Sequence, residues 1–265
     1  MGRVSDGVLL ADGWGPDSPP DDTLVRAGVV SLCDRIRHMA EALGRDVLTG
    51  DTWVGASLAS SGLFSNALVV TRPVDEWRPV VDALHALAGP GVLKLLVSPF
   101  PTPDLADLGL HLVGHPPFMI RPAGPCVGPG LADVRVERVD TADLLCAFER
   151  TLIEAYPVGG MDPSAVPVLF PESYLDGASA AYVALLRGEA VAVSAAHVAS
   201  GVNHVEFIAT RAEARGLGIG AAVTAAATST DPTLPAVLIA SDLGRRIYES
   251  LGFLAVTRWT LWLAE

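Results

Sequence analysis

The sequence predicts an α/β fold of the α+β type, arranged as two lobes. Short apolar segments of strand length alternate with amphipathic segments of helical spacing in both halves of the chain. A stretch rich in proline and glycine, residues 121–130, lies between the halves and is typical of a linker. We therefore expect one lobe over residues 1–125 and a second over residues 131–265.

The first lobe is expected to hold two long helices and three strands. Residues 22–43 have apolar side chains at helical spacing, and 75–87 form a second amphipathic segment that ends at a glycine-proline turn. The remaining expected elements are loops over 1–22, a loop through Trp53, Gly55 and Gly62, strands over 66–71, 92–98 and 118–121, and a short helix over 103–112.

The second lobe is expected to alternate strands and helices to the end of the chain. Its elements are a strand over 134–139, a helix over 141–154, a hairpin of 180–186 and 190–196 around Arg187-Gly188-Glu189, a strand over 204–209, a helix over 221–228 and, within 238–253, a further strand, a helix and a closing Leu-Gly-Phe turn.

Composition limits the class of protein. Half of the 265 residues are hydrophobic, which is ample for one large core or two modest ones. The net charge of −12 argues against nucleic acid as a partner and favours a cationic one such as an amine, although solubility explains most of the charges. The three cysteines lack metal-ligand spacing and fit a reducing compartment. We expect a cytoplasmic protein with no metal, signal peptide or membrane partner, either a monomer or a homodimer.

A glycine-rich segment carries most of the functional information. The apolar strand that ends at Thr210 leads through a short polar turn into Arg215-Gly216-Leu217-Gly218-Ile219-Gly220, and an alanine-rich helix follows. Glycines at a helix N-terminus let backbone N–H groups approach an anion, and the helix dipole adds positive potential. The segment therefore predicts a pyrophosphate site. It lacks the lysine of a Walker loop and the spacing of a dinucleotide fold.

This loop resembles the coenzyme A loop of the GNAT superfamily of N-acetyltransferases. The resemblance continues downstream, where Tyr248-Glu249-Ser250-Leu251-Gly252-Phe253 looks like the family's closing Tyr-x-x-Leu-Gly-Phe, and it covers residues 131–265. It implies a mixed central sheet and acetyl-CoA as co-substrate. The residues that the resemblance assigns to coenzyme A are Ile208, Ala209 and Thr210 at a strand bulge, Arg215, Gly216, Leu217, Gly218, Ile219, Gly220 and Ala221 around the pyrophosphate, and Ser241.

The resemblance also implies the groups that move protons. Tyr248 matches the family's usual general acid, which protonates the leaving thiolate. For the base, His204 and Glu206 alternate on one face of the strand before the bulge. Either side chain, or a water chain without a dedicated residue, can remove the proton of the amine. Asp242 is expected to cap the following helix.

The first half resembles a degenerate copy of the same fold. Its order from residue 66 is strand, helix, strand, helix, strand, but residues 69–76 contain no glycine loop, and we align 110–115 with the Tyr-x-x-Leu-Gly-Phe segment. An unrelated α/β cap is the alternative. Residues of 156–174 and the side chains of Trp53, Phe64, Asn66, Trp259 and Trp262 are candidates for the acceptor cleft.

The sequence therefore predicts an acetyl-CoA-dependent N-acetyltransferase that acts on a primary amine of a small molecule or on a peptide N-terminus, by direct attack in a ternary complex. A non-catalytic module that binds coenzyme A as a sensor or scaffold is the alternative, and a longer acyl group is a further variant.

Overall fold

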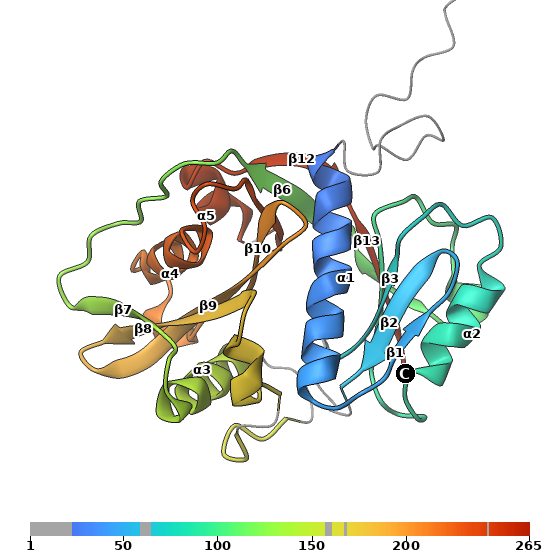
Figure 1. Ribbon diagram of the computed structural model, residues 1–265, viewed down its shortest axis with the longest axis horizontal. Coiled ribbons are helices and arrows are strands. Elements are labelled where there is room, and N and C mark those ends of the chain that lie inside the picture. Colours follow the sequence, from blue (N-terminus) through green and yellow to red (C-terminus); the bar gives the residue numbers. More distant parts are fainter. Residues whose placement is uncertain (1–22, 59–64, 157–160, 167–168, 243) are drawn as a thin grey trace, which may run out of the picture.

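The structure is a computed structural model that describes residues 23–58, 65–156, 161–166, 169–242 and 244–265. The molecule has two lobes, each built on a mixed β-sheet, and helix α1 stands between them (Figure 1). This arrangement confirms the predicted fold class. The expected loop over 1–22 and the residues Gly62 and Phe64 lie outside the described residues.

In the first lobe, the main helices and strands agree with the sequence prediction. The long helix begins where Thr23 accepts a hydrogen bond from the backbone N–H of Arg26, at 3.1 Å. The elements are α1 (Leu24–Ala42), β1 (Val47–Thr49), β2 (Trp53–Ser57), β3 (Asn66–Val70), α2 (Arg78–Ala86), β4 (Lys94–Ser98), the 3₁₀ turn η1 (Ala106–Leu108) and β5 (His111–Gly114).

The expected loop through Trp53 and Gly55 was wrong, because these residues form strand β2 of the β1–β2 hairpin. Gly55 is a strand residue that faces Leu68 of β3, and a Cβ at Gly55 would come within 3.0 Å of the carbonyl oxygen of Ala67. The glycine therefore allows close strand contact here and does not mark a turn.

The expected helix over 103–112 was too long, because only the 3₁₀ turn η1 (Ala106–Leu108) forms there. The alignment of 110–115 with the closing Tyr-x-x-Leu-Gly-Phe turn was also wrong. The matching segment is Leu108-Gly109-Leu110, because Gly109 has a φ of 85° and Gly252 of the second copy has a φ of 88°. Both turns have the same hydrogen bonds, with Leu110 N–H donating to Leu105 O and Phe253 N–H donating to Tyr248 O. Leu105 therefore occupies the place of Tyr248, and the first copy has no phenol there.

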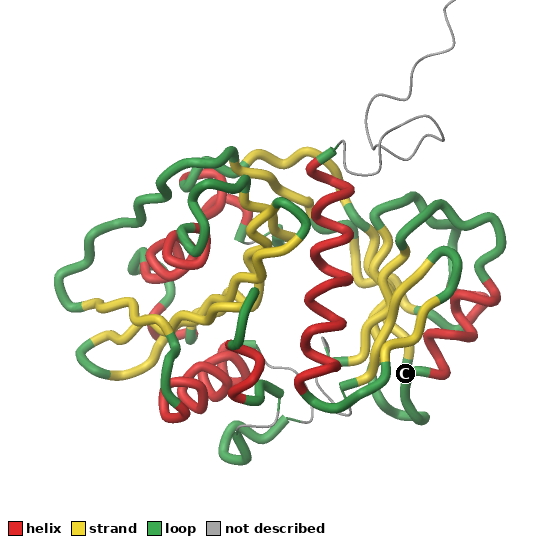
Figure 2. Tube along the Cα trace, viewed as in Figure 1, coloured by secondary structure: helices red, strands yellow, loops and turns green. Residues whose placement is uncertain are grey.

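The second lobe follows the expected order closely, and its helices cover both faces of the sheet (Figure 2). Its elements are β6 (Pro117–Arg121), β7 (Val134–Arg138), α3 (Ala142–Ala155), η2 (Glu172–Leu175), β8 (Ser179–Leu186), β9 (Glu189–Ala199), β10 (Val202–Thr210), η3 (Ala212–Ala214), α4 (Ile219–Thr228), β11 (Ala236–Ile239), α5 (Arg245–Ser250) and β12 (Leu254–Arg258). The last strand of the chain, β13 (Thr260–Ala264), lies in the sheet of the first lobe.

The two lobes exchange a strand. The first sheet has the order β1-β2-β3-β4-β13-β5, and the second has the order β12-β6-β11-β10-β9-β8-β7. Strand β6 thus leaves the first half of the chain to pair with β11 and β12, and β13 leaves the second half to pair with β4 and β5. The division into domains of 1–125 and 131–265 stays a prediction. Each of these two segments contributes one strand to the sheet of the other.

The two crossing segments are bound to each other. Trp259 donates its backbone N–H to Pro116 O at 3.0 Å, and its ring stacks on Phe118 with centroids 4.7 Å apart. Both rings are fully buried. Separating the first half of the chain from the second would break this stack and remove an interior strand from each sheet, so the two lobes form one structural unit.

Allowing for this exchange, the two sheets repeat one pattern. The order β1-β2-β3-β4-β13-β5 corresponds to β8-β9-β10-β11-β6-β12, with β3–β4 and β10–β11 as the parallel pairs. In the first copy, α2 follows β3 without a glycine loop and begins with a proline in its first turn. This supports a degenerate copy of one fold over an unrelated cap.

Candidate active site

The centre of the site is an irregularity in strand β10. Its pairing with β9 runs regularly to Glu206 opposite Ala195 and resumes at Ala209 opposite Val193, so one extra residue is inserted. Phe207 has a φ of 51°, which is unusual for a residue with a side chain. Such local strain is typical of functional positions. The sequence did not single out Phe207, because a bulge is defined by the partner strand.

Strands β10 and β11 separate at the same place. Their parallel pairing consists of Asn203 opposite Ala236 and His204 opposite Val237, although β10 continues to Thr210 and β11 to Ile239. Beyond His204, the edge of β10 that faces β11 is therefore free of that ladder. Of the three predicted residues, Ile208 lies in the bulge, while Ala209 and Thr210 pair with β9 beyond it.

The glycine loop prepares the start of helix α4 for an anion. Gly216 and Gly218 have φ values of 77° and 82°, and Gly218 caps the helix without a side-chain hydrogen bond. The N–H groups of the first helical turn, at Ile219, Gly220 and Ala221, therefore have no capping side chain. This geometry fits the predicted pyrophosphate site.

Two loop residues have structural roles that the sequence did not specify. Arg215 donates from Nε to Thr210 O at 3.0 Å and from a terminal nitrogen to Ala155 O at 3.2 Å, so its guanidinium ties the loop to β10 and α3. A Cβ at Gly220 would meet Thr210 Oγ1 at 3.2 Å, so this glycine lets α4 lie close to the end of β10.

Tyr248 is placed by helix α5 and is 7% exposed. Burial, with a smaller contribution from Tyr156, raises the pKa of its phenol above the ordinary value and keeps the hydroxyl protonated. Gly244 makes room for the ring, since a Cβ there would lie 3.0 Å from Cε2 and 3.1 Å from the hydroxyl oxygen of Tyr248. A protonated phenol is what a general acid requires.

His204 and Glu206 lie on β10 before the bulge, as predicted, but their environments differ. His204 is 2% exposed, and its burial, with help from Arg35 and His197, lowers its pKa to about 3. The imidazole is therefore neutral near pH 7 and a weak base. Burial raises the pKa of Glu206, while Arg35 acts in the opposite direction.

Arg35 of helix α1 reaches Glu206 from the first lobe. Its Nε lies 3.0 Å from Glu206 Oε2, with the two side chains 6% and 10% exposed. The guanidinium also lies 5.5 Å from the centre of the Phe207 ring and donates to Met39 Sδ. Sequence reasoning missed this residue, because nothing local links a helix near residue 35 to a strand near residue 206.

These groups meet at a cavity of about 390 Å³ between the lobes. Of the residues predicted for catalysis or coenzyme binding, His204, Glu206, Ile208, Ser241 and Tyr248 line it. Phe207 and Arg35, which were not predicted, line it as well. The loop residues 215–221 and the bulge neighbours Ala209 and Thr210 are not part of the lining. The structure thus separates the predicted phosphate site from the predicted site of proton transfer.

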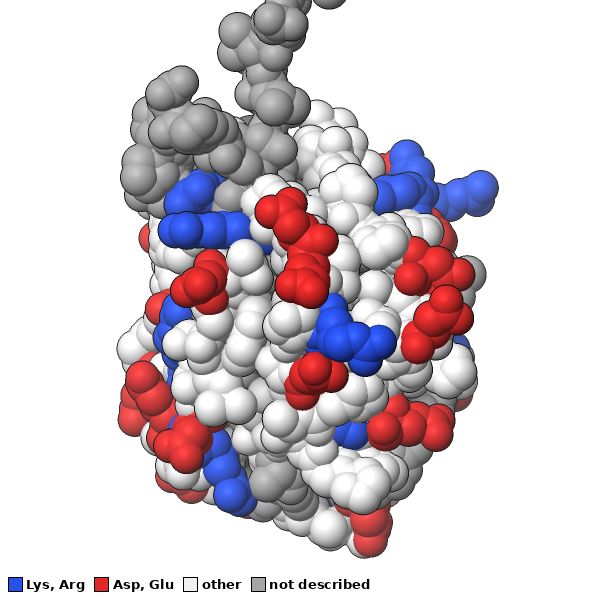
Figure 3. All heavy atoms as spheres, turned by 90° about the vertical axis from the view of Figure 1, so that its right-hand side faces the viewer, with Lys and Arg blue, Asp and Glu red and all other residues white. Residues whose placement is uncertain are grey.

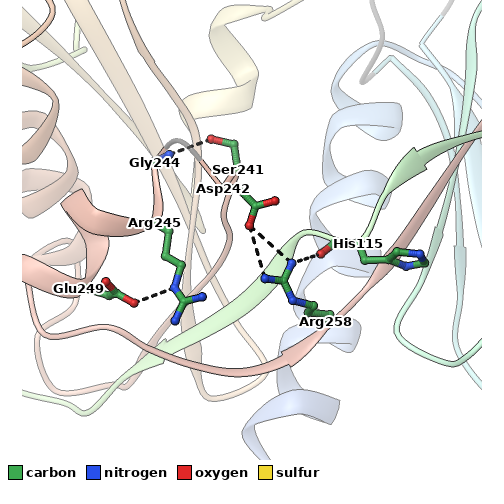
Figure 4. A network of polar contacts seen from close by, with 7 residues as sticks. All are labelled: His115, Ser241, Asp242, Gly244, Arg245, Glu249 and Arg258. Carbon is green, nitrogen blue, oxygen red and sulfur yellow. Dashed lines mark hydrogen bonds and ion pairs between the residues drawn. The ribbon is translucent and has the colours of Figure 1, made fainter.

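A polar network holds the rim of the cavity (Figure 4). Ser241 Oγ accepts from the Gly244 N–H at 3.1 Å, while Asp242 lies 3.5 Å from Arg258. Arg258 also donates to the carbonyl oxygen of His115, between β5 and β6. The expected helix-capping role of Asp242 was wrong, because Gly244 is the N-cap of α5 and no side chain caps this helix. The network joins the β11–α5 loop to the point where the strands cross.

Most of the proposed cleft aromatics are structural. Trp262 is buried in the first lobe and donates to Thr102, and Trp259 belongs to the stack at the crossing. Trp53 does not line the cavity, and Asn66 is buried with its amide bound to Leu93 O. Tyr156 does line the cavity.

The surface of the first lobe carries charges of both signs, and the described helices are too short or too polar to cross a membrane. On the face of the first lobe drawn in Figure 3, Arg side chains are interspersed with Asp and Glu. None of the helices in the described part of the chain combines the length and apolarity that a membrane crossing needs.

Comparison with solved structures supports the architecture. A GCN5-related N-acetyltransferase from Kribbella flavida matches with a TM-score of 0.64 at 21% identity, covering 90% of this chain and 95% of that one. A conserved protein of unknown function from Staphylococcus epidermidis matches with a TM-score of 0.59 at 15% identity, over 84% and 95%. A GCN5-related N-acetyltransferase from Sphaerobacter thermophilus matches with a TM-score of 0.53 at 13% identity, over 91% and 93%.

These matches span both lobes, so this chain has the GNAT fold over about 90% of its length. No protein-family model matches the sequence, and no curated protein matches it.

Proposed function

We propose that this chain, which has the fold of the GCN5-related N-acetyltransferases, transfers an acetyl group from acetyl-CoA to a primary amine. The observation that carries the proposal is the coincidence of three features. The β10 bulge, the separation of β10 from β11 and the buried phenol of Tyr248 all meet at one cavity.

The residues present fit acetyl-CoA. The uncapped N-terminus of α4, with Gly216 and Gly218 in the left-handed region, offers backbone donors to a pyrophosphate. The free edge of β10 beyond His204 offers backbone groups to the amide-containing arm of the coenzyme. When bound, the co-substrate supplies an activated acetyl thioester. The first lobe has no equivalent loop, so we expect one coenzyme per chain.

The chain's own groups serve the proton transfers. The amine nitrogen forms a bond to the acetyl carbon as the carbon–sulfur bond breaks, and Tyr248 donates its hydroxyl proton to the departing sulfur. We assign the removal of the amine proton to Glu206, directly or through water. Its raised pKa suits a base near neutrality better than the depressed pKa of His204.

The first test measures thiol release from acetyl-CoA with a panel of amines. Tyr248→Phe should lower kcat by about 10²- to 10⁴-fold, the range for losing a general acid, with little change in coenzyme affinity by calorimetry. Tyr182→Phe is a matched control, because the Tyr182 hydroxyl binds Thr230 at 3.0 Å and does not line the cavity.

The same assay separates the enzyme from the alternative. Coenzyme binding without thiol release for any amine would favour a sensor or scaffold module. Full turnover by Tyr248→Phe would show that water or the substrate supplies the proton.

A further inference from the structure

The walls of the cavity limit the acceptor, if the proposed acetyl transfer takes place there. Most of the lining that the first lobe supplies is aliphatic. It consists of Leu32 and Ile36 of α1, Ala67 and Val69 of β3, Leu95 and Val97 of β4, and Val113 next to the crossing, and Leu261 of the exchanged β13 adds to the same wall. All of these except Val113 and Leu261 belong to one apolar cluster of the core, and Leu261 packs against that cluster.

The buried charges at the cavity are paired. Among the described residues that line it, Glu206 and Asp242 carry the carboxylates. Glu206 is already paired with Arg35, and Asp242 at the rim faces Arg258. His204 adds no charge, because burial keeps it neutral. The buried carboxylate of the described lining is thus already neutralised, and the solvent-exposed Asp242 at the rim would stabilise a second ammonium group of a substrate only weakly.

We propose that the acceptor is a compact apolar monoamine, such as an arylalkyl or branched alkyl amine without a second charge. Its apolar body packs against the aliphatic wall, and its nitrogen lies near Glu206. An apolar site whose buried carboxylate is already paired favours the neutral, nucleophilic form of one amine. A polyamine or aminoglycoside would have to bury further unpaired ammonium groups, which is costly.

The test compares four probes with the full-length protein: 2-phenylethylamine, spermidine, kanamycin and L-phenylalanine. We expect kcat/KM for 2-phenylethylamine to exceed that for each of the others by at least about 100-fold, because burying an unpaired charge weakens binding by more than that factor. Comparable or better turnover of spermidine, kanamycin or L-phenylalanine would overturn the proposal and leave acetyl transfer intact.

Calorimetry separates the two proposals when turnover fails. Binding of 2-phenylethylamine to the protein in the presence of coenzyme A, without acetyl transfer, would refute the proposed function and support the ligand class. Absence of both binding and turnover for 2-phenylethylamine and its smaller alkyl analogues would refute the ligand class.

Variants on strand β3 locate the contact. Ala67→Val adds two methyl groups to the wall and narrows the cavity. It should lower kcat/KM for 2-phenylethylamine by about tenfold or more relative to propylamine, because a single methylene in an apolar pocket already has an effect of that size. Leu68→Val is the matched control, because Leu68 is the next residue of β3 and packs in the other apolar cluster, away from the cavity. An equal change of preference in both variants would contradict the proposed orientation.

Discussion

Replacing Arg35 by Met removes the positive partner of a buried carboxylate. The Arg35 and Glu206 side chains are 6% and 10% exposed, with 3.0 Å between Nε and Oε2. Breaking such a pair from one side costs about 3–5 kcal/mol, because the remaining charge is buried without compensation. Loss of the guanidinium from the Phe207 ring contributes about 0.5–2 kcal/mol of that cost. We therefore expect Arg35→Met to lower the free energy of unfolding by about 3–5 kcal/mol.

Urea unfolding at pH 7 measures this loss, and a double-mutant cycle assigns it to the pair. Glu206→Gln alone should also destabilise the protein, because it leaves Arg35 unpaired. The double variant should recover much of the stability, with a coupling energy of about 2 kcal/mol or more. A cost below about 1 kcal/mol for Arg35→Met, or strictly additive effects, would refute this account of the pair.

The same variant tests Glu206 as the base. Arg35 lowers the pKa of Glu206 against the effect of burial, so its removal should raise that pKa further. A base acts when deprotonated, so the rise of kcat/KM with pH should move to higher pH in Arg35→Met. Arg35→Lys keeps the charge and should leave the profile near that of the wild type. An unmoved profile in Arg35→Met would assign the base to another group or to water.

Three further changes test the site. Gly244→Ala should lower kcat without weakening coenzyme affinity, since the new Cβ would lie 3.1 Å from the Tyr248 hydroxyl, and steady-state kinetics with calorimetry check this. Gly216→Ala and Gly91→Ala, at φ values of 77° and 76° with open space around both, should each cost about 1–2 kcal/mol, but calorimetry should show weaker coenzyme binding for Gly216→Ala alone. The pKa of His204 is lowered from 6.5 to about 3, so between these pH values the unfolded chain binds a proton that the folded chain does not. Stability should therefore fall as the pH drops from 6.5 towards 3. In His204→Asn, the slope of the unfolding free energy against pH should be smaller by about 1.4 kcal/mol per pH unit in this range, as urea unfolding at several pH values would measure.

The parts of the site that depend on short segments could be predicted from sequence. The glycine loop and the segment from Tyr248 to Phe253 each encode their geometry within a few residues, through glycines that adopt positive φ and a fixed helical spacing. The alternation of His204 and Glu206 on one strand face is equally local. These predictions needed no knowledge of which strands pair.

The parts that failed depend on contacts between distant segments. Strands β6 and β13 are both short and apolar, and neither sequence indicates that the strand joins the sheet built mainly from the other half of the chain. Gly109 and Gly114 lie five positions apart, and the hydrogen bonds of the turn show that Gly109 matches Gly252. Arg35 was missed for the same reason, since its partner lies in the other half of the chain.

The exchange of strands makes a definite prediction about fragments split after Gly130. A Cβ added at that glycine would meet no atom of a non-adjacent residue within 4 Å, so the chain has room for new termini there. A fragment of residues 131–265 lacks β6, which lies between β11 and β12, and it lacks α1 with Arg35 and all of the aliphatic wall of the cavity except Leu261. We expect this fragment alone to be poorly soluble and inactive towards the native acceptor, because its apolar faces and strand edges are uncovered.

Co-expression with residues 1–130 should restore both solubility and thiol release, because each fragment supplies the strand that the other sheet lacks. Size-exclusion chromatography of the co-expressed pair should show one complex that contains both fragments. The matched control deletes β6 by ending the first fragment at residue 116, which should abolish rescue while leaving α1 present. A soluble 131–265 fragment with full activity would show that the first lobe contributes neither the sheet nor the site, and rescue by the shortened fragment would show that the exchanged strand is dispensable.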